Sequence, residues 1–260
     1  MRNLRSGSWS VPKDGNAVWE NDDARCMHQS GEIRTRVPAR FAVADGATDA
    51  TFSGLWARLV TRSFVRFGVP TSGDDCETEE FLAFFRRLQR RWMRATGQGT
   101  GRLNWSAEAR VVREGSFCTF AGVEFHLDDL GCEMRWWAIG DACVIVASAK
   151  GSVDSFPLKG SWEFSNRSAM VKTRGDFLET HDSDVFFGRR FLKKGDRILL
   201  VTDALAEQLL SRRIQGLPNK FLPDWLHVSM SDMEFQEWVA MARIFGMKND
   251  DVTLVMVEVG

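Results

Sequence analysis

Residues 36–50 have the sequence RVPARFAVADGATDA, in which an apolar run leads into a turn. The alternation over Arg36–Ala44 predicts a half-buried strand, because successive side chains of a strand point to opposite faces. Asp45 and Gly46 come next, and this pair is typical of a turn that ends a strand. Over Phe52–Phe67 apolar residues recur at helical spacing, which predicts a helix with one buried face. The segment therefore predicts a strand and a helix joined through an acidic turn.

The rest of the chain predicts more strands than helices. Apolar residues at helical spacing predict helices at Glu77–Ala95, Ala204–Arg212 and Ser231–Phe245. In the last of these, Ser231 and Glu234 have the spacing of a capping box. Runs rich in Val, Ile, Phe and Trp predict strands at Ser116–Phe125, Cys132–Ile139, Ala142–Ser148, Asp196–Thr202 and Val252–Val259. We therefore expect an α+β protein in which two sheets pack face to face and helices bracket them.

Size and composition narrow the class of the protein. A chain of 260 residues is short for two independent domains, so we expect one domain over residues 1–260. The net charge of -1 argues against a nucleic-acid binder driven by bulk electrostatics. No apolar run approaches the roughly 18 residues of a membrane-spanning helix, and the first residues, MRNLRSGSWSV, do not resemble a secretory signal. We expect a cytoplasmic protein with no membrane contact.

The cysteines and the aspartates differ in what they predict. The five cysteines lack CxxC spacing, which fits neither a disulfide framework nor a zinc site. Four aspartates, in contrast, stand where predicted strands begin or end: Asp45, Asp141, Asp203 and Asp250. Carboxylates brought together from several strands suit Mg²⁺ or Mn²⁺, which prefer oxygen ligands. An aspartate at a strand end is also an ordinary turn former, so this pattern alone leaves both interpretations open.

Five motifs in order add a family resemblance. They are GNAVWENDDA (15–24), VADGATD (43–49), AIGDACVIV (138–146), KKGDRILLVTDALAE (193–207) and NDDVTLVMVEV (249–259). Their series across nearly the whole chain resembles that of the type-2C (PPM) serine/threonine phosphatases, of the bacterial type. Each motif alone is unspecific, but five in the correct order are a strong signal. The resemblance implies a four-layer α-β-β-α sandwich of two antiparallel sheets flanked by helices, with a metal centre at one edge.

The resemblance also assigns roles to residues of the motifs. It implies that Asp45 bridges two Mg²⁺ or Mn²⁺ ions, that Gly46 offers its carbonyl, and that Asp203 and Asp250 hold one ion. By the same resemblance, Asp22 assists through a water, Asp23 orients the attacking water, and Asp141 with Asp203 matches a weaker third metal position. Two cations activate a water and stabilise charge on the phosphoryl group. The implied activity is hydrolysis of phosphoserine or phosphothreonine in proteins, with a cognate kinase or its target as partner.

Departures from the family pattern bear on activity. Val18 stands where many members have a phosphate-binding arginine, and Arg34 or Arg36 is a possible replacement from a neighbouring strand. Three further exchanges keep the metal carboxylates: Asp22 for glutamate, Ala142 for serine and Ala204 for glycine. Besides the phosphatase, two functions stay open: a catalytically weak pseudophosphatase that binds phosphorylated partners, and a phosphoesterase of small molecules.

Two further segments have alternative interpretations. The run RRLQRRWMR, Arg86–Arg94, is expected to be the solvated side of an amphipathic helix, with docking of nucleic acid or an acidic partner as the alternative. The segment Asp176–Arg190 is expected to be either a flap near the site or an ordinary loop before a strand.

Overall fold

The computed structural model describes residues 3–34, 37–47, 50–70, 78–97, 115–128, 131–164, 169–174, 185–214 and 226–260. In chain order the elements up to the second helix are β1 (Leu4–Val11), η1 (Val18–Glu20), β2 (Ala24–Met27), β3 (Gly31–Ile33), β4 (Ala39–Ala44), α1 (Ser53–Phe67) and α2 (Thr78–Gly97). Then follow β5 (Phe117–Cys118), β6 (Phe120–Leu127), β7 (Cys132–Ile139), β8 (Cys143–Ala147), β9 (Val153–Phe156), η3 (Ser161–Glu163) and β10 (Val171–Lys172). The last elements are β11 (Val185–Leu192), β12 (Arg197–Val201), α4 (Asp203–Ile214), α5 (Asp232–Ile244) and β13 (Val252–Val259).

Two large antiparallel sheets form the centre of the protein. The six-stranded sheet has the order β3-β1-β13-β12-β8-β9, and the five-stranded sheet has the order β11-β7-β6-β4-β2. Strands β5 and β10 form a small additional pair. The strand pairs within both large sheets are antiparallel.

The sheets face each other through alternate side chains of their strands. In β4, Phe41 and Val43 belong to the core between the sheets, whereas the intervening Ala42 belongs to the core under α1 and α2. In β13, Val255 lies in the core between the sheets and Met256 in the core under α4 and α5. Because strand side chains alternate between faces, β4 and β13 each contribute side chains to two cores.

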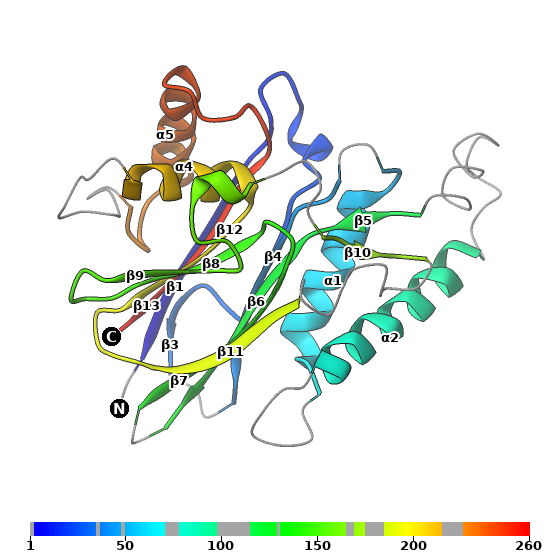
Figure 1. Ribbon diagram of the computed structural model, residues 1–260, viewed down its shortest axis with the longest axis horizontal. Coiled ribbons are helices and arrows are strands. Elements are labelled where there is room, and N and C mark those ends of the chain that lie inside the picture. The colour runs from blue at the N-terminus through cyan, green and yellow to red at the C-terminus, as the bar shows by residue number, and fades with distance from the viewer. Residues whose placement is uncertain are drawn as a thin grey trace.

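Helices cover the two outer faces, as Figure 1 shows. Helices α1 and α2 lie on the five-stranded sheet, where the centroid of the Phe64 ring is 5.3 Å from that of Phe120 and 5.6 Å from that of Trp137. Helices α4 and α5 lie on the six-stranded sheet, where the ring centroids of Phe235 and Trp9 are 6.1 Å apart. Truncating a buried aromatic such as Phe64 to alanine costs about 3–5 kcal/mol in stability. The four-layer sandwich predicted from the sequence is thus confirmed.

The segment Asp176–Arg190 differs from the prediction of a flap or loop. Residues 185–190 belong to β11, a strand that pairs with β7 at the edge of the five-stranded sheet. A side chain at Gly188 would come within 2.4 Å of the Trp136 ring, so the glycine lets the strand cross that ring closely. Exposed arginines and a glycine obscure the strand pattern in the sequence. Residues 176–184 lie outside the described residues, as does Arg36.

No helix in the described ranges is both long and apolar enough to cross a membrane.

Candidate metal centre

The predicted acidic residues come from separate elements that end at one edge of the sandwich. Asp45 directly follows β4, Asp141 lies in the turn between β7 and β8, and Asp203 follows β12 and begins α4. Asp250 lies just before β13, and Asp22 and Asp23 lie just before β2. The ends of β4 and β2 are neighbours, since Ala24 pairs with Ala44. The structure therefore gathers aspartates that are more than 200 residues apart in the sequence.

Asp45 lies at the centre of this group. Burial raises the pKa of its carboxyl well above the ordinary value, and repulsion from Asp23, Asp203, Asp141 and Asp250 raises this pKa further. Its backbone carbonyl accepts a hydrogen bond from the Thr119 N–H at 2.9 Å, which fixes the turn after β4 to the neighbouring segment. Crowding of several carboxylates around one buried carboxylate is unfavourable unless a proton or a cation balances the charge.

Asp23 has one satisfied and one unsatisfied carboxylate oxygen. The Thr202 hydroxyl donates a hydrogen bond of 2.9 Å to Asp23 Oδ2. The other oxygen, Oδ1, is buried and has no hydrogen-bond partner among the described residues. Burial raises the pKa of Asp23 well above its ordinary value, and repulsion from Asp251 adds to the increase. A buried carboxylate oxygen without a partner costs free energy, so this oxygen is suited to receive a ligand or a water.

Asp22 and Gly46 are held by close backbone packing. The Gly54 N–H, in the first turn of α1, donates to Asp22 Oδ1 at 3.2 Å, which places a negative charge at the positive end of the helix. A Cβ at Gly54 would lie 2.7 Å from that oxygen. A Cβ at Gly46 would lie 2.7 Å from the Asp22 carbonyl oxygen. Both glycines therefore allow the turn after β4, the loop before β2 and the start of α1 to meet.

Asp251 braces the loop that carries Asp22 and Asp23. Its two carboxylate oxygens accept hydrogen bonds of 2.7 Å from the backbone N–H groups of Lys13 and Asp22. Sequence reasoning did not assign Asp251 a role. Its position directly after Asp250, next to a predicted metal ligand, is the signal that could have found it.

Lys248 neutralises one side of the cluster. Its ammonium nitrogen lies 2.7 Å from Asp203 Oδ2 and 2.8 Å from Asp250 Oδ2. Partial burial alone would lower the pKa of Lys248, but the hydrogen bonds to the two carboxylates outweigh it and raise this pKa above the ordinary value. A cation is thus already placed between two of the predicted metal ligands. Sequence reasoning missed this lysine.

The donor set fits a hard divalent cation. It consists of carboxylate oxygens and a glycine carbonyl, the ligands that Mg²⁺ and Mn²⁺ prefer. Within the described ranges no three acidic, histidine or cysteine side chains are already arranged around a single ion position. The Asp203–Asp250 pair holds the Lys248 ammonium instead.

Arg34, suggested as a replacement for the arginine missing at position 18, does not lie beside the carboxylates. Val18, on η1, is 77% exposed. Arg34 pairs with Glu32 at 2.6 Å, at the end of β3 that lies beside the start of β1. The other end of β1 lies beside Val252 near the cluster, and the seven residue-to-residue steps from Leu4 to Val11 separate the two ends of β1 by about 23 Å. That distance exceeds the reach of an arginine side chain.

Arg58 of α1 is instead close to the carboxylates. Its Nη1 donates to the carbonyl oxygen of Asn21 at 3.4 Å, and its charge favours ionisation of Asp22. The net pKa of Asp22 is nevertheless raised, mainly by burial. The helical spacing of the apolar residues puts Arg58 on the opposite, polar face of α1, and only the contact between α1 and the loop before β2 shows its position.

Comparison with known proteins agrees with this fold and these motifs. The model of the family "Protein phosphatase 2C" matches residues 21–240. A search of curated proteins found no match. Among solved structures, the catalytic domain of the serine/threonine protein phosphatase PstP with two manganese ions has 16% identity and a TM-score of 0.61, over 100% of this chain and 99% of that chain.

Two further solved structures have the same fold. RsbX in complex with magnesium has 12% identity and a TM-score of 0.57, over 99% of this chain and 96% of that chain. The S. agalactiae serine/threonine phosphatase has 11% identity and a TM-score of 0.59, over 98% of this chain and 99% of that chain. At these identities the likeness shows the fold, while the family model matches most of the sequence itself. The chain belongs to the protein phosphatase 2C family.

Proposed function

We propose that this chain is a Mn²⁺- or Mg²⁺-dependent phosphatase that removes phosphate from phosphoserine and phosphothreonine in proteins. It acts through one domain over residues 1–260 in the cytoplasm, on proteins phosphorylated by a cognate kinase or on that kinase. The observation that carries the proposal is the crowding of mutually repelling carboxylates around Asp45, in a chain of the phosphatase 2C family.

Each predicted residue has a place in this function. The metal ligands would be Asp45, Gly46 through its carbonyl, Asp203 and Asp250, with Asp22 and Asp141 in supporting positions. When bound, the ions would supply a nucleophilic oxygen at neutral pH and stabilise charge on the phosphoryl group. The close packing at Gly46 and Gly54 supports this arrangement, because it holds the turn after β4 against the loop that carries Asp22.

Asp23 would orient the attacking water. Its Oδ2 accepts the Thr202 hydroxyl proton in a hydrogen bond, which locks the carboxylate in one orientation and leaves Oδ1 to accept a hydrogen bond from that water. A carboxylate held in this way contributes by positioning, since no reorganisation is needed when the substrate arrives. Asp251 supports the same loop through its hydrogen bonds to the Lys13 and Asp22 N–H groups.

Hydrolysis of an aryl phosphate in Mn²⁺ tests the proposal. We expect turnover by the purified protein, its loss on addition of a chelator, and its loss in Asp45→Asn. Asp154→Asn is the matched control, because Asp154 lies on the edge strand β9 and pairs with Arg190 away from the cluster. Turnover of aryl phosphate and not of phosphopeptides would favour a phosphoesterase of small molecules.

A second candidate is a pseudophosphatase that binds phosphorylated partners. It is favoured by the Lys248 ammonium, which occupies the Asp203–Asp250 pair, and by the valine at position 18. In this case the protein would bind a phosphopeptide without turning over either the peptide or an aryl phosphate at saturating Mn²⁺.

A further inference from the structure

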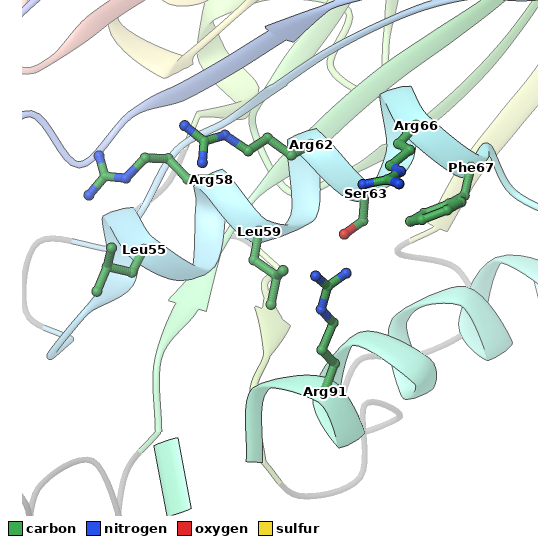
Figure 2. Close-up of a pocket in the computed structure, with 8 residues that line it drawn as sticks. All are labelled: Leu55, Arg58, Leu59, Arg62, Ser63, Arg66, Phe67 and Arg91. Carbon is green, nitrogen blue, oxygen red and sulfur yellow. The ribbon is translucent and has the colours of Figure 1, made fainter. Parts of the chain in front are cut away.

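A groove between α1 and α2 is lined by unusually many arginines (Figure 2). Its volume is about 310 Å³. The arginines are Arg58, Arg62 and Arg66 of α1 and Arg91 of α2. In Figure 2 Arg58, Arg62 and Arg66 follow one another along α1, with Arg58 and Arg62 extending on the side away from α2, and Arg91 reaches from α2 toward α1. Between them lie apolar side chains, of which Leu55 is 50% and Phe67 59% exposed.

Within the described part of the chain, these four guanidinium groups are not taken up by ion pairs. Among the residues that the structure describes, no carboxylate forms an ion pair with any of them; Arg58 donates to a backbone carbonyl and the Arg66 guanidinium lies 5.2 Å from the Phe67 ring. Helix α1 contains no acidic residue at all. Arg62, Arg66 and Arg91 are exposed. A guanidinium presents a planar fork of donors that matches carboxylates and phosphates, so the groove is suited to an anionic partner.

The charge of this layer contrasts with that of the whole molecule. The net charge of the chain is -1, yet α2 adds Arg86, Arg87, Arg90 and Arg94 to the same outer layer. Its acids, Glu79 and Glu80, lie in its first turn. The positive charge is therefore concentrated over one of the two helical layers. Such a concentration attracts anionic partners and accelerates their association.

The arginine row starts beside the carboxylate cluster. Gly54, in the first turn of α1, contacts Asp22, and a helix rises 1.5 Å per residue. Arg58, Arg62 and Arg66 therefore lie about 6, 12 and 18 Å from that contact along the helix. An extended peptide covers about 3.3 Å per residue. A chain whose phosphorylated residue sits at the cluster would thus pass the three arginines about two, four and five residues away.

We propose that this groove binds the acidic segment that flanks the phosphorylated residue of a protein substrate. The proposal rests on the proposed function and names its substrate class. Carboxylates of the segment pair with the α1 arginines and Arg91, and an apolar side chain packs against the exposed face of Phe67 and Leu55. The row begins beside the carboxylate cluster, where the phosphorylated residue of a protein substrate would lie, and this continuity favours a substrate segment over a nucleic acid.

Binding to a metal-free protein tests the groove without requiring activity. The probe is a fluorescein-labelled peptide with aspartates two, four and five residues from an unphosphorylated threonine, measured by anisotropy in chelator. We expect saturable binding that weakens as salt is added. The double variant Arg62→Glu/Arg66→Glu and the single variant Arg91→Glu should each raise Kd at least tenfold.

The matched control is Arg90→Glu. Arg90 is an exposed neighbour of Arg91 on the same helix that does not line the groove, so its reversal changes the net charge equally. We expect a change in Kd of less than twofold. Equal weakening by Arg90→Glu and Arg91→Glu, or equal binding of a peptide with asparagine in place of each aspartate, would overturn the proposal. So would tighter binding of a single-stranded oligonucleotide, or of phosphatidylserine vesicles, than of the acidic peptide.

Kinetics separate this proposal from the proposed function. With the phosphothreonine form of the peptide in Mn²⁺, Arg62→Glu/Arg66→Glu should raise KM for the peptide at least tenfold relative to KM for an aryl phosphate. Turnover of neither substrate by the wild-type protein would refute the proposed function, and the anisotropy result would still decide whether the groove binds acidic segments. An unchanged KM ratio in an active enzyme would refute the docking proposal alone.

Discussion

The two sides of the carboxylate cluster balance their charge differently. On one side Asp23 is buried and Asp45 is half-buried. These two carboxylates repel each other, and Asp23 accepts a hydrogen bond from the Thr202 hydroxyl. On the other side Asp203 and Asp250 share the Lys248 ammonium at 2.7 and 2.8 Å. Repulsion between carboxylates therefore remains on the Asp23–Asp45 side, whereas Lys248 balances the negative charge on the Asp203–Asp250 side. The two sides should respond in opposite directions when a charge is removed.

The largest expected effect is the loss of metal binding in Asp45→Asn. Asp45 is the carboxylate that all the others surround, and changes even to residues that only support a metal ligand cost 10–100-fold in affinity. We expect Kd for Mn²⁺ to rise at least about a hundredfold. Isothermal calorimetry measures it, with Asp154→Asn as the control. Equal Mn²⁺ affinity in wild type and Asp45→Asn would show that the proposed centre is elsewhere.

The second prediction concerns the neutralised side. Lys248→Met keeps the length of the side chain and removes its charge, so Mn²⁺ no longer competes with the ammonium for Asp203 and Asp250. We expect Mn²⁺ to bind about tenfold more tightly, roughly 1.4 kcal/mol, and the metal-free protein to melt at a lower temperature. Lys150→Met, at an exposed turn, serves as the control. Weaker Mn²⁺ binding in Lys248→Met would mean that the lysine supports the metal site instead of competing for it.

The third prediction concerns how the stability of the metal-free protein depends on pH through Asp23, on the side without a lysine. Because the pKa of Asp23 is raised in the folded protein, mainly by burial, the folded state binds a proton more tightly than the unfolded state. This contribution to stability is fully present below the ordinary pKa of about 4 and is lost as the pH rises through the raised value. The melting temperature of the metal-free protein should therefore fall over this pH range.

Asp23→Asn should flatten this dependence. The amide cannot ionise and still accepts the Thr202 hydrogen bond, so the variant should exceed the wild type by about 1 kcal/mol at pH 7 and match it near pH 4. Thermal unfolding at several pH values in chelator measures both proteins. A wild-type stability that rises with pH while that of Asp23→Asn stays constant would contradict the stated sign. Lys248→Met and Asp23→Asn thus shift metal-free stability in opposite directions.

The places of Asp45 and Asp203 at strand ends were predictable from the sequence, whereas their assignment as metal ligands came from the family resemblance and stays a prediction. Asp45 and Asp203 each follow a run of apolar residues. In an antiparallel pair the end of one strand lies beside the start of its neighbour, so Asp203 after β12 comes near Asp250 before β13, and Asp45 after β4 comes near Asp23 before β2. Fold class and layer order followed from the same periodicity. The edge strand β11 was not predictable, since its glycine and arginines hide the alternation that buried strands show.

Lys248 and Arg58 were missed for a different reason. A single lysine in a loop and an arginine on the outer face of a helix look like solvated surface, which is the ordinary fate of such residues. Their roles depend on contacts across more than 30 residues of sequence: Lys248 with Asp203, and Arg58 with Asn21. The suggestion of Arg34 was wrong because the strand register of β3 and β1 carries it away from the cluster.

The smallest expected effect comes from restoring an arginine at position 18. Val18 is 77% exposed, so a guanidinium there would remain solvated, and exposed charge pairs contribute about 0.2–1 kcal/mol. We expect Val18→Arg to lower KM for a phosphopeptide about threefold with kcat unchanged, the sign of added ground-state binding. If Arg58 already binds the phosphate, Arg58→Ala should raise KM, and Val18→Arg should have a larger effect in the Arg58→Ala background than in the wild type. Steady-state kinetics of the two single variants and the double variant measure this coupling. Strictly additive effects would mean that the two positions act independently. If Val18→Arg had no effect in either background, phosphate capture would depend on the carboxylate-bound cations alone.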